Sequence, residues 1–274
     1  MDVLIDDKEL NVLLNEIYVY TGFDFRDYSV PSLKRRVSKC MREEKLHRPA
    51  EFRQKVLVSP QSLNRLLQAL PVHVTAMFRD AGFYLFFKQQ VIPWLKTYPF
   101  VRLWIAGCST GEEVYSVAIL LEEAGLLDRT LLYATDFNLV VLNKAKSGLF
   151  PVSSIRQYSR NYFEAGGSST LSDYYTIDYN DRVKFDSALV KNVVWSRHNL
   201  TTDHSFNEFN VIFCRNVLIY FNKELQNHVH ELLYGSLAAF GILGLGNKET
   251  IEFTPRQRQY EVLDSRQKFY RKMK

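Results

Sequence analysis

The segment Leu103–Glu113, LWIAGCSTGEE, most constrains the fold because it predicts a buried strand, a glycine turn and a helix in direct succession. Leu103–Ala106 is a short apolar run that Gly107 ends, and apolar residues then recur at helical spacing. Thr130–Thr135 predicts a second strand, and Asp136 follows at its carboxyl end. In a doubly wound sheet, ligands bind outside the carboxyl ends of the strands, where an acid can hold ribose hydroxyls. This order therefore predicts a site for a nucleoside cofactor.

The charge at the start of the predicted helix discriminates between nucleoside cofactors. The pyrophosphate of a dinucleotide binds bare backbone amides and the positive dipole of a helix N-terminus. Here Glu112 and Glu113 occupy the first turn, where their carboxylates satisfy that dipole and repel phosphate. The glycines also depart from the G-x-G-x-x-G pattern. A cationic methyl donor such as S-adenosylmethionine fits better than a nicotinamide or a flavin. The alternative is that the two acids only cap the helix.

Beyond Pro71, strand and helix signals alternate, which predicts a parallel, doubly wound α/β sheet. The further elements expected are a helix at Leu139–Lys146, a strand at Val211–Cys214, a helix at Lys223–Ala239 and a strand at Ile242–Leu245. The region Gly148–Ser196 interrupts this order with glycines, serines and short alternating runs. We interpret it as an insertion that forms a small antiparallel β-subdomain.

Residues 1–71 carry only helical signals and are expected to form an all-helical domain, followed by a second domain over residues 72–274. Leu10, Leu13, Leu14 and Ile17 recur at the spacing of a helix with one apolar face. Pro31 can open a second helix whose polar faces are strongly basic. Most of the chain's net charge of +5 lies in this helix.

Composition narrows the class of protein further. The three cysteines include no C-x-x-C pair, which argues for a reducing compartment without disulfides or structural zinc. The six histidines form no ligand-spaced pairs, so no metal site is expected. Asp2, Asp6 and Asp7 have the wrong charge for a signal peptide, and Leu237–Gly246 is only half as long as a membrane span of ~20 residues. We expect a soluble cytoplasmic protein.

The segment Val72–Asp80, VHVTAMFRD, places candidate binding residues just before the predicted sheet. If it is helical, Thr75 and Arg79 lie four residues apart on one face. The guanidinium of Arg79 can then hold a carboxylate with two hydrogen bonds. A surface ion pair between Arg79 and Asp80 is the alternative.

Polar side chains also follow two other predicted strands. Arg215 and Asn216 interrupt the apolar run VIFCRNVLIYF, and burying them is costly unless both are hydrogen-bonded. Their place at a strand's carboxyl end predicts that they line the cleft. Tyr220 either presents its hydroxyl to a substrate or packs as an ordinary aromatic residue. Asn199 follows the predicted strand VVWS, where a side-chain amide can recognise an adenine edge.

These segments together resemble the chemotaxis receptor methyltransferases of the CheR type, which methylate glutamate side chains on receptor proteins. The matching motifs are VTAMFRD, IAGCSTGEEVYSVA, ATDFNLVVLNKAKSGLF, HNL, FNVIFCRNVLIYFN and LGLGNKE, together with the basic N-terminal helix. The resemblance covers essentially the whole chain. It implies an all-helical N-terminal domain, followed by a Rossmann-like methyltransferase domain with an inserted three-stranded β-subdomain.

The resemblance also implies functional residues. Contacts to S-adenosylmethionine, with S-adenosylhomocysteine as product, are implied for His73, Thr75, Arg79, Glu113, Asp136, Asn199, Leu200, Arg215 and Asn216. Tyr220 and Arg79 are implied to lie near the reacting methyl group. A docking surface for cytoplasmic helices of a chemoreceptor is implied for Lys34, Arg35, Arg36, Lys39 and Arg42. We expect a monomer that has no nucleic-acid partner and does not insert into membranes.

The implied reaction is consistent with the residue types. A glutamate side chain has a pKa near ~4.3 and is already a carboxylate at neutral pH. It needs no general base, only an in-line approach to the methyl group. Catalysis by orientation therefore explains why the sequence offers no convincing His–acid or Cys–His dyad.

Three alternatives remain open at this point. The motif Gly107–Gly111 also fits the G-x-S-x-G turn of α/β-hydrolases, and Ser109, Asp136 and His198 follow in the required order. Two acids beside the oxyanion hole, a helical upstream region and a nucleophile after the first strand count against it. A non-catalytic module that binds S-adenosylmethionine is the second alternative. A nucleic-acid methyltransferase is the third, and its binding would weaken steeply with salt.

Overall fold

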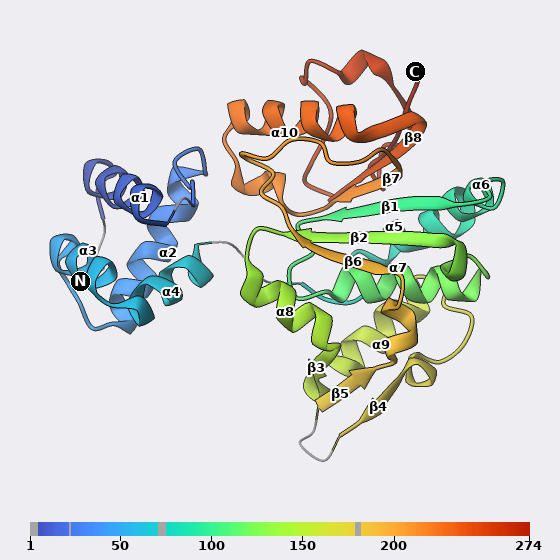
Figure 1. The fold of residues 1–274 in the computed structure, drawn as a ribbon, viewed down its shortest axis with the longest axis horizontal. Helices are drawn as coiled ribbons and strands as arrows, with labels where there is room; N and C mark the ends of the chain where they lie inside the picture. The colour runs from blue at the N-terminus through green and yellow to red at the C-terminus, as the bar shows by residue number, and fades with distance from the viewer. Residues whose placement is uncertain (1–4, 22, 71–74, 179–181) are drawn as a thin grey trace. The chain divides into compact units, whose positions relative to one another are not determined.

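The computed structural model describes residues 5–21, 23–70, 75–178 and 182–274 (Figure 1). The chain divides into two compact units. The helical unit comprises Met1–His73 and Ile219–His228, and the sheet unit comprises Val74–Leu218 and Val229–Lys274. The N-terminal helices therefore form one unit with a segment from far along the chain.

The helical unit contains the helices α1 (Asp7–Thr21), α2 (Val30–Glu43), α3 (Pro49–Val58) and α4 (Pro60–Ala69). A proline stands in the first turn of α2, α3 and α4, where its missing N–H costs nothing. Ser59 caps α4, because its side chain accepts a hydrogen bond from the N–H of Ser62. The spacing predicted for α1 is confirmed, since Leu10, Leu13, Leu14 and Ile17 are all buried.

The segment Ile219–His228 is held to the helical unit by backbone and side-chain contacts. Tyr28 and Phe221 form an antiparallel bridge, and their rings meet edge to face with centroids 4.9 Å apart. The N–H of Asn222 donates to the carbonyl of Asp27 at 2.8 Å. The N–H of Ser29 donates to the carbonyl of Tyr220 at 2.8 Å. These bonds explain why the segment groups with the helices.

The sheet unit is built on a seven-stranded sheet of order β6-β2-β1-β7-β8-β10-β9. Its strands are β1 (Val101–Ala106), β2 (Thr130–Asp136), β6 (Val193–Arg197), β7 (Phe209–Cys214), β8 (Leu237–Leu245), β9 (Tyr260–Asp264) and β10 (Phe269–Lys272). The first five strands in that order pair in parallel, and β10 runs antiparallel to β8 and β9. The predicted doubly wound sheet is confirmed, and the carboxyl ends of β1, β2, β6 and β7 meet at one edge.

Helices connect these strands and complete the apolar core. They are α5 (Ala81–Phe86), continued by the π-helical turn η1 (Phe87–Val91) and α6 (Ile92–Leu95), then α7 (Glu112–Glu123), α8 (Leu139–Ser147), α9 (Ile155–Glu164) and α10 (Lys223–Ser236). Short 3₁₀ turns lie at Leu127–Arg129, Val152–Ser154, Leu171–Tyr174, Ser187–Val190, Leu218–Tyr220 and Gln257–Gln259. Phe83 of α5, Ile119 of α7 and Ile105 of β1 belong to one buried cluster. This cluster fixes α5 and α7 against the sheet.

The predicted β-subdomain is present with different limits. Its three-stranded sheet has the order β3-β5-β4, with β3 (Leu149–Pro151), β5 (Arg182–Phe185) and β4 (Tyr175–Ile177). β6 belongs to the large sheet, where Ala134 pairs with Trp195, so the insertion ends before residue 193 and not at 196. The helix expected at Lys223–Ala239 ends at Ser236, because the next strand already begins there. In the described part of the chain, no helix has the length and apolar character needed to cross a membrane.

Candidate functional site

The loop that follows β1 is fastened to the end of β2. The N–H groups of Gly107 and Cys108 donate to the carbonyl of Thr135 at 2.8 and 2.9 Å. The N–H of Ser109 donates to Oδ2 of Asp136 at 2.9 Å. The other carboxylate oxygen of Asp136 accepts from the N–H of Asn138 at 2.9 Å. Asp136 therefore connects both strand ends of the first α/β unit, as its place in the sequence predicts.

Asp136 has an unusual charge environment. It is buried, and burial raises its pKa to about 6, although backbone N–H donors partly oppose this shift. An ionised carboxylate can accept about four hydrogen bonds. Asp136 can therefore accept a ligand hydroxyl in addition to its backbone donors from Ser109, Phe137 and Asn138.

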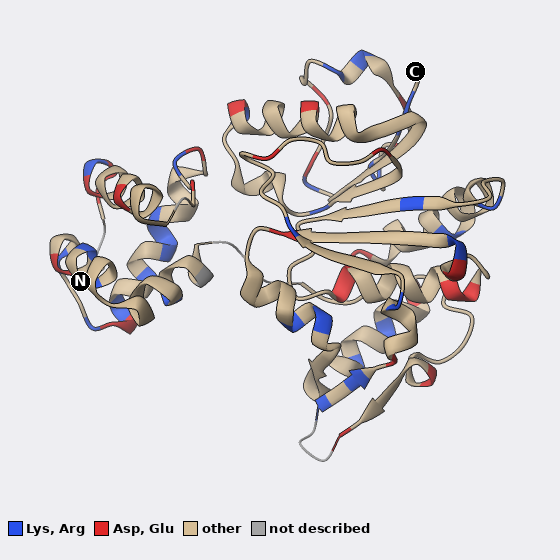
Figure 2. Cartoon of the chain, in the orientation of Figure 1, with Lys and Arg blue, Asp and Glu red and all other residues tan. Residues whose placement is uncertain are grey.

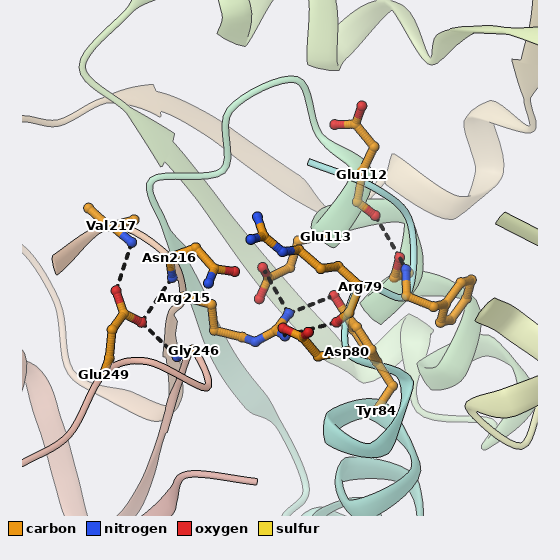
Figure 3. Close-up of polar contacts among 12 residues, drawn as sticks. Arg79, Asp80, Tyr84, Glu112, Glu113, Arg215, Asn216, Val217, Gly246 and Glu249 are labelled. Carbon is orange, nitrogen blue, oxygen red and sulfur yellow. Dashed lines mark hydrogen bonds and ion pairs between the residues drawn. The ribbon is translucent and has the colours of Figure 1, made fainter. Parts of the chain in front are cut away.

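The start of α7 requires a glycine and separates the two acids that follow it. Gly111 has φ of 95°, and a Cβ there would lie 2.9 Å from Cβ of Ala145 in α8. Glu112 points away from the strand ends, and its carboxylate accepts from Thr110 at 2.6 Å and from Tyr158 at 3.4 Å. Only Glu113 faces the residues at the end of β7 (Figure 3). Of the two acids, Glu113 is therefore the one placed at this sheet edge, and its contact with the cofactor stays a prediction.

Arg215, directly after β7, is the centre of a buried polar cluster (Figure 3). Its side chain is 1% exposed. Its Nη2 donates to the carbonyl of Arg79 at 2.8 Å and to Oδ2 of Asp80 at 3.0 Å. Its Nη1 donates to the hydroxyl of Tyr84 at 3.2 Å and to Oε2 of Glu113 at 3.4 Å. The two Nη atoms of the buried guanidinium are thus hydrogen-bonded as predicted, by four partners, while Nε has none.

The charges in this cluster influence one another. Burial alone would lower the pKa of Arg215, but the negative charges of Glu113 and Asp80 outweigh it, so the pKa is raised and Arg215 stays cationic. Burial raises the pKa of Glu113, while Arg215 and Arg79 act in the opposite direction. Among the described residues, Oε1 of Glu113 is a buried oxygen that lacks a hydrogen-bond donor. That orphaned acceptor suits an ammonium group or another cationic donor.

The segment expected to be helical before the sheet is an irregular turn. Phe78 and Asp80 have φ of 53° and 60°, and α5 begins only at Ala81. Thr75 and Arg79 would share a face only if this segment were helical, and that condition is not met. The N–H of Phe78 donates to Oγ of Ser116 at 2.9 Å, which holds the turn against α7. Another implied contact, His73, lies outside the described residues.

The residues after β6 adjoin Asp136 through the backbone. The N–H of His198 donates to the carbonyl of Asp136 at 3.2 Å. Oδ1 of Asn199 accepts from the N–H and Oγ1 of Thr201 at 3.1 and 2.9 Å, forming a turn. Leu200 is buried beside it. Asn199 and Leu200 thus lie at the same sheet edge as Asp136, as the resemblance implies.

The hydrolase alternative requires a bond between His198 and Asp136 that the structure lacks. Nε2 of His198 lies 3.1 Å from the carbonyl of His204. Its Nδ1 is among the described buried atoms without a partner. The carboxylate of Asp136 is instead bonded to backbone N–H groups of Ser109 and Asn138. The Ser–Asp–His order in the sequence therefore does not become a catalytic triad.

The basic residues of α2, blue in Figure 2, divide into exposed and buried members. Arg35, Lys39 and Arg42 are exposed, and Lys34 pairs with Asp7 at 2.8 Å. Arg36, in contrast, is only 7% exposed. Its guanidinium donates to the carbonyl of Leu70 and lies 4.9 Å from the ring centre of Tyr220. Arg36 therefore cannot belong to a docking face, and Tyr220 is grouped with the helical unit.

Three residues near Arg215 were not predicted as site residues. Asp80 was considered only as a surface partner of Arg79, and the structure pairs it with Arg215 at 3.0 Å. For Tyr84, the sequence gives no signal beyond the position of this residue in an apolar helical segment. Glu249 accepts from the N–H of Asn216 at 2.9 Å. The sequence did offer a signal for Glu249, because it is the acid that ends the motif LGLGNKE.

Comparison with known proteins identifies the family. Residues 73–269 match the CheR methyltransferase, SAM binding domain, and residues 8–71 match the CheR methyltransferase, all-alpha domain. The chain belongs to the CheR methyltransferase family. It is 43% identical to Cher3 of Pseudomonas putida, over 97% of each chain. It is 29% identical to the chemotaxis protein methyltransferase of Listeria innocua, over 84% of this chain and 85% of that one.

A third relative is the chemotaxis protein methyltransferase of Salmonella typhimurium, 32% identical over 67% of this chain and 62% of that one. The CheR membership assigns S-adenosylmethionine as the cofactor and methyl transfer as the activity. The residues present fit that cofactor, since the buried Oε1 of Glu113 offers an acceptor to a cationic group. Asp136 lies at the strand edge where ribose hydroxyls bind in such sheets. The predicted family and cofactor are therefore confirmed.

Proposed function

We propose that this protein transfers the methyl group of S-adenosylmethionine to glutamate side-chain carboxylates of chemoreceptors, forming methyl esters. The observation that carries the proposal is the match of the chain to both CheR domains, with relatives named chemotaxis protein methyltransferase. The proposal makes the protein a protein-glutamate O-methyltransferase of chemosensory adaptation. Its substrate would be the cytoplasmic helices of a receptor.

The proposed cofactor contacts follow the geometry at the strand ends. Asp136 would accept a ribose hydroxyl, because its carboxylate has capacity beyond its backbone donors. Glu113 would accept the ammonium through its orphaned Oε1. Further contacts are proposed, from the family resemblance, for Thr75, Arg79, Asn199, Leu200, Arg215, Asn216 and His73. Arg215 is already committed to Asp80 and Glu113, so we assign it mainly to fixing Glu113.

The proposed catalysis depends on orientation and charge. When bound, S-adenosylmethionine supplies the electrophilic methyl group. A substrate glutamate, with a pKa near ~4.3, is ionised at neutral pH and needs no base. Arg79 is the cation proposed to attract that carboxylate, and Tyr220 is proposed to help orient it. Correct orientation of two reactants is worth up to roughly 7–11 kcal/mol, which is sufficient for a large acceleration.

Receptor docking is proposed for the exposed basic face of α2. Arg35, Lys39 and Arg42 are spaced so that they share one side of the helix. Such a face is complementary to an acidic helical surface and steers its approach. In this proposal residues 1–71 dock the substrate and residues 72–274 carry the chemistry.

The test is a methylation assay with tritiated S-adenosylmethionine and membranes that contain the chemoreceptors of the source cell. We expect label on a receptor-sized band that base treatment releases, because methyl esters hydrolyse in base and N-methyl groups do not. A receptor whose candidate glutamates are changed to alanine is the matched control. Base-stable label, or label on nucleic acid, would contradict the proposal.

A further inference from the structure

Glu249 is a buried carboxylate in the sheet unit to which the proposed function gives no role. It follows β8 and is 4% exposed. Its Oε1 accepts from the N–H groups of Val217 and Leu218 at 2.9 and 2.8 Å. Its Oε2 accepts from the N–H groups of Asn216 and Gly246 at 2.9 and 2.6 Å (Figure 3). One carboxylate therefore joins the turn after β7 to the turn after β8.

The turn after β7 has a backbone conformation that requires such an acceptor. Asn216 has φ of 60°, in the left-handed region that non-glycine residues rarely adopt. The three successive N–H groups of Asn216, Val217 and Leu218 converge on Glu249. Converging N–H groups form a concavity that binds anions. Glu249 fills this concavity from within the protein, so the turn keeps its shape without an external anion.

The two turns are also packed closely. A Cβ at Gly246 would lie 2.7 Å from Oε2 of Glu249 and 2.8 Å from the backbone nitrogen of Asn216. Any side chain there would push the two turns apart. The fixed turn begins directly after Arg215, and the amide of Asn216 extends toward Glu113 (Figure 3). A change at Glu249 therefore reaches Asn216 through the hydrogen bond to its backbone N–H.

We propose that Glu249 is a positioning residue for the cofactor, because it holds the turn that carries Asn216 at the end of β7. This inference rests on the proposed function in taking Asn216 as a cofactor contact. Glu249 itself would not touch the cofactor, since its four hydrogen bonds go to backbone N–H groups. Its effect would act through Asn216.

The first test compares Glu249→Gln with wild type by calorimetric titration of S-adenosylhomocysteine into the full-length protein. Glutamine has the same size as glutamate. In either orientation of its amide, however, the NH₂ group faces two backbone N–H donors, so one of the two acceptor oxygens is lost. We expect affinity to fall about tenfold or more. The control is Glu123→Gln, another buried glutamate, bonded to Lys88 at 2.7 Å and the N–H of Ser168 at 3.0 Å.

The control is matched in burial and differs in position. The side chain of Glu123 is 4% exposed, and it ends α7 about 15 Å along the helix from Glu113. A purely structural loss would lower the melting temperature of both variants and leave S-adenosylhomocysteine affinity unchanged. The proposal requires that affinity falls in Glu249→Gln and not in Glu123→Gln. Equal affinities in wild type and Glu249→Gln would overturn it.

A double-mutant cycle tests whether Glu249 acts through Asn216. Asn216→Gly removes the amide and accepts φ of 60° without strain. In that background we expect Glu249→Gln to have little further effect on affinity. Full additivity of the two changes would overturn the proposal, because independent sites add.

A second variant, Gly246→Ala, tests the proposal in case Glu249→Gln does not fold. Gly246→Ala keeps the carboxylate and displaces the two turns, so we expect it to weaken S-adenosylhomocysteine binding as well. Unchanged affinity for S-adenosylhomocysteine in a folded Gly246→Ala protein would refute the role of Glu249 in holding the two turns. Failure of the proposed function gives a different result, namely wild-type protein that binds S-adenosylhomocysteine and leaves receptor glutamates unlabelled.

Discussion

Asp136 should make binding of S-adenosylhomocysteine depend on pH near neutrality. Burial raises the pKa of Asp136 to about 6 in the ligand-free protein. Hydroxyl groups that donate to the carboxylate favour its ionised form, so binding lowers this pKa. Affinity for S-adenosylhomocysteine is therefore highest at a pH above the pKa of Asp136 in the ligand-free protein, and it decreases as the pH falls below that pKa. Each pH unit below that point costs about tenfold in affinity, equivalent to ~1.4 kcal/mol.

Isothermal titration calorimetry between about pH 5 and pH 8 measures this dependence directly. Wild-type affinity at about pH 5 should be roughly tenfold weaker than at pH 7. Asp136→Asn is the matched variant, since its amide has the same size and does not titrate. Its binding should be weaker at every pH and lack the acidic decline. A wild-type affinity that is constant with pH, or the same decline in Asp136→Asn, would refute the assignment.

Two further predictions concern the buried cluster and the basic helix. Arg215→Met should lower the free energy of unfolding by ~3–5 kcal/mol, measured by urea denaturation, because Glu113 is left buried without its cation. A loss no larger than that of a surface substitution would contradict the ion-pair geometry. Changing Arg35, Lys39 and Arg42 together to glutamine should raise the KM for the receptor and reduce its salt dependence, with S-adenosylhomocysteine affinity unchanged.

The control for the triple variant removes the same charge from another surface. Arg160, Arg258 and Arg266 are exposed residues of the sheet unit. Their combined change to glutamine should leave the KM for the receptor unaltered. If both triple variants raise the KM equally, the effect is one of net charge and α2 has no special role.

The strand–turn–helix at the start of the sheet could be predicted because local residues determine it. Gly107 ends an apolar run, and the glycine that begins α7 allows a backbone angle and a close approach that other residues would not. Asp136 was predictable for the same reason, since a residue at a strand's end has a known place in a parallel sheet. The pairing of β2, the strand that ends at Asp136, with β1 and β6 then follows from the order of the strands in the sheet.

The turn at Thr75–Asp80 could not be predicted from spacing. Its left-handed residues are held by tertiary contacts, such as that of Phe78 with Ser116, a partner 38 positions away. The same applies to Glu249, whose partner Asn216 lies 33 positions earlier. Local sequence does not reveal a bond whose two ends meet only in the folded sheet.

Arg36 illustrates a signal that was available in the sequence. It lies three residues after Leu33 and four before Cys40, both buried, so helical spacing places it on the apolar face of α2. Arg35 and Lys39 occupy a different side and are exposed. Counting the basic residues of α2 as one set obscured this difference. The structure separates the exposed basic residues of α2 from a buried cation that contacts Tyr220.

The preference for a cationic cofactor has a broader basis than the two acids of α7. Several backbone N–H groups at the described sheet edge are already bonded and are not available to a phosphate. Those of Ser109 and Asn138 donate to Asp136, and those of Asn216 and its two successors donate to Glu249. Burial raises the pKa of Asp136, so the ionised carboxylate is costly there and a nearby cation offsets that cost. A sulfonium nucleoside relieves that cost, whereas a phosphate would add to it.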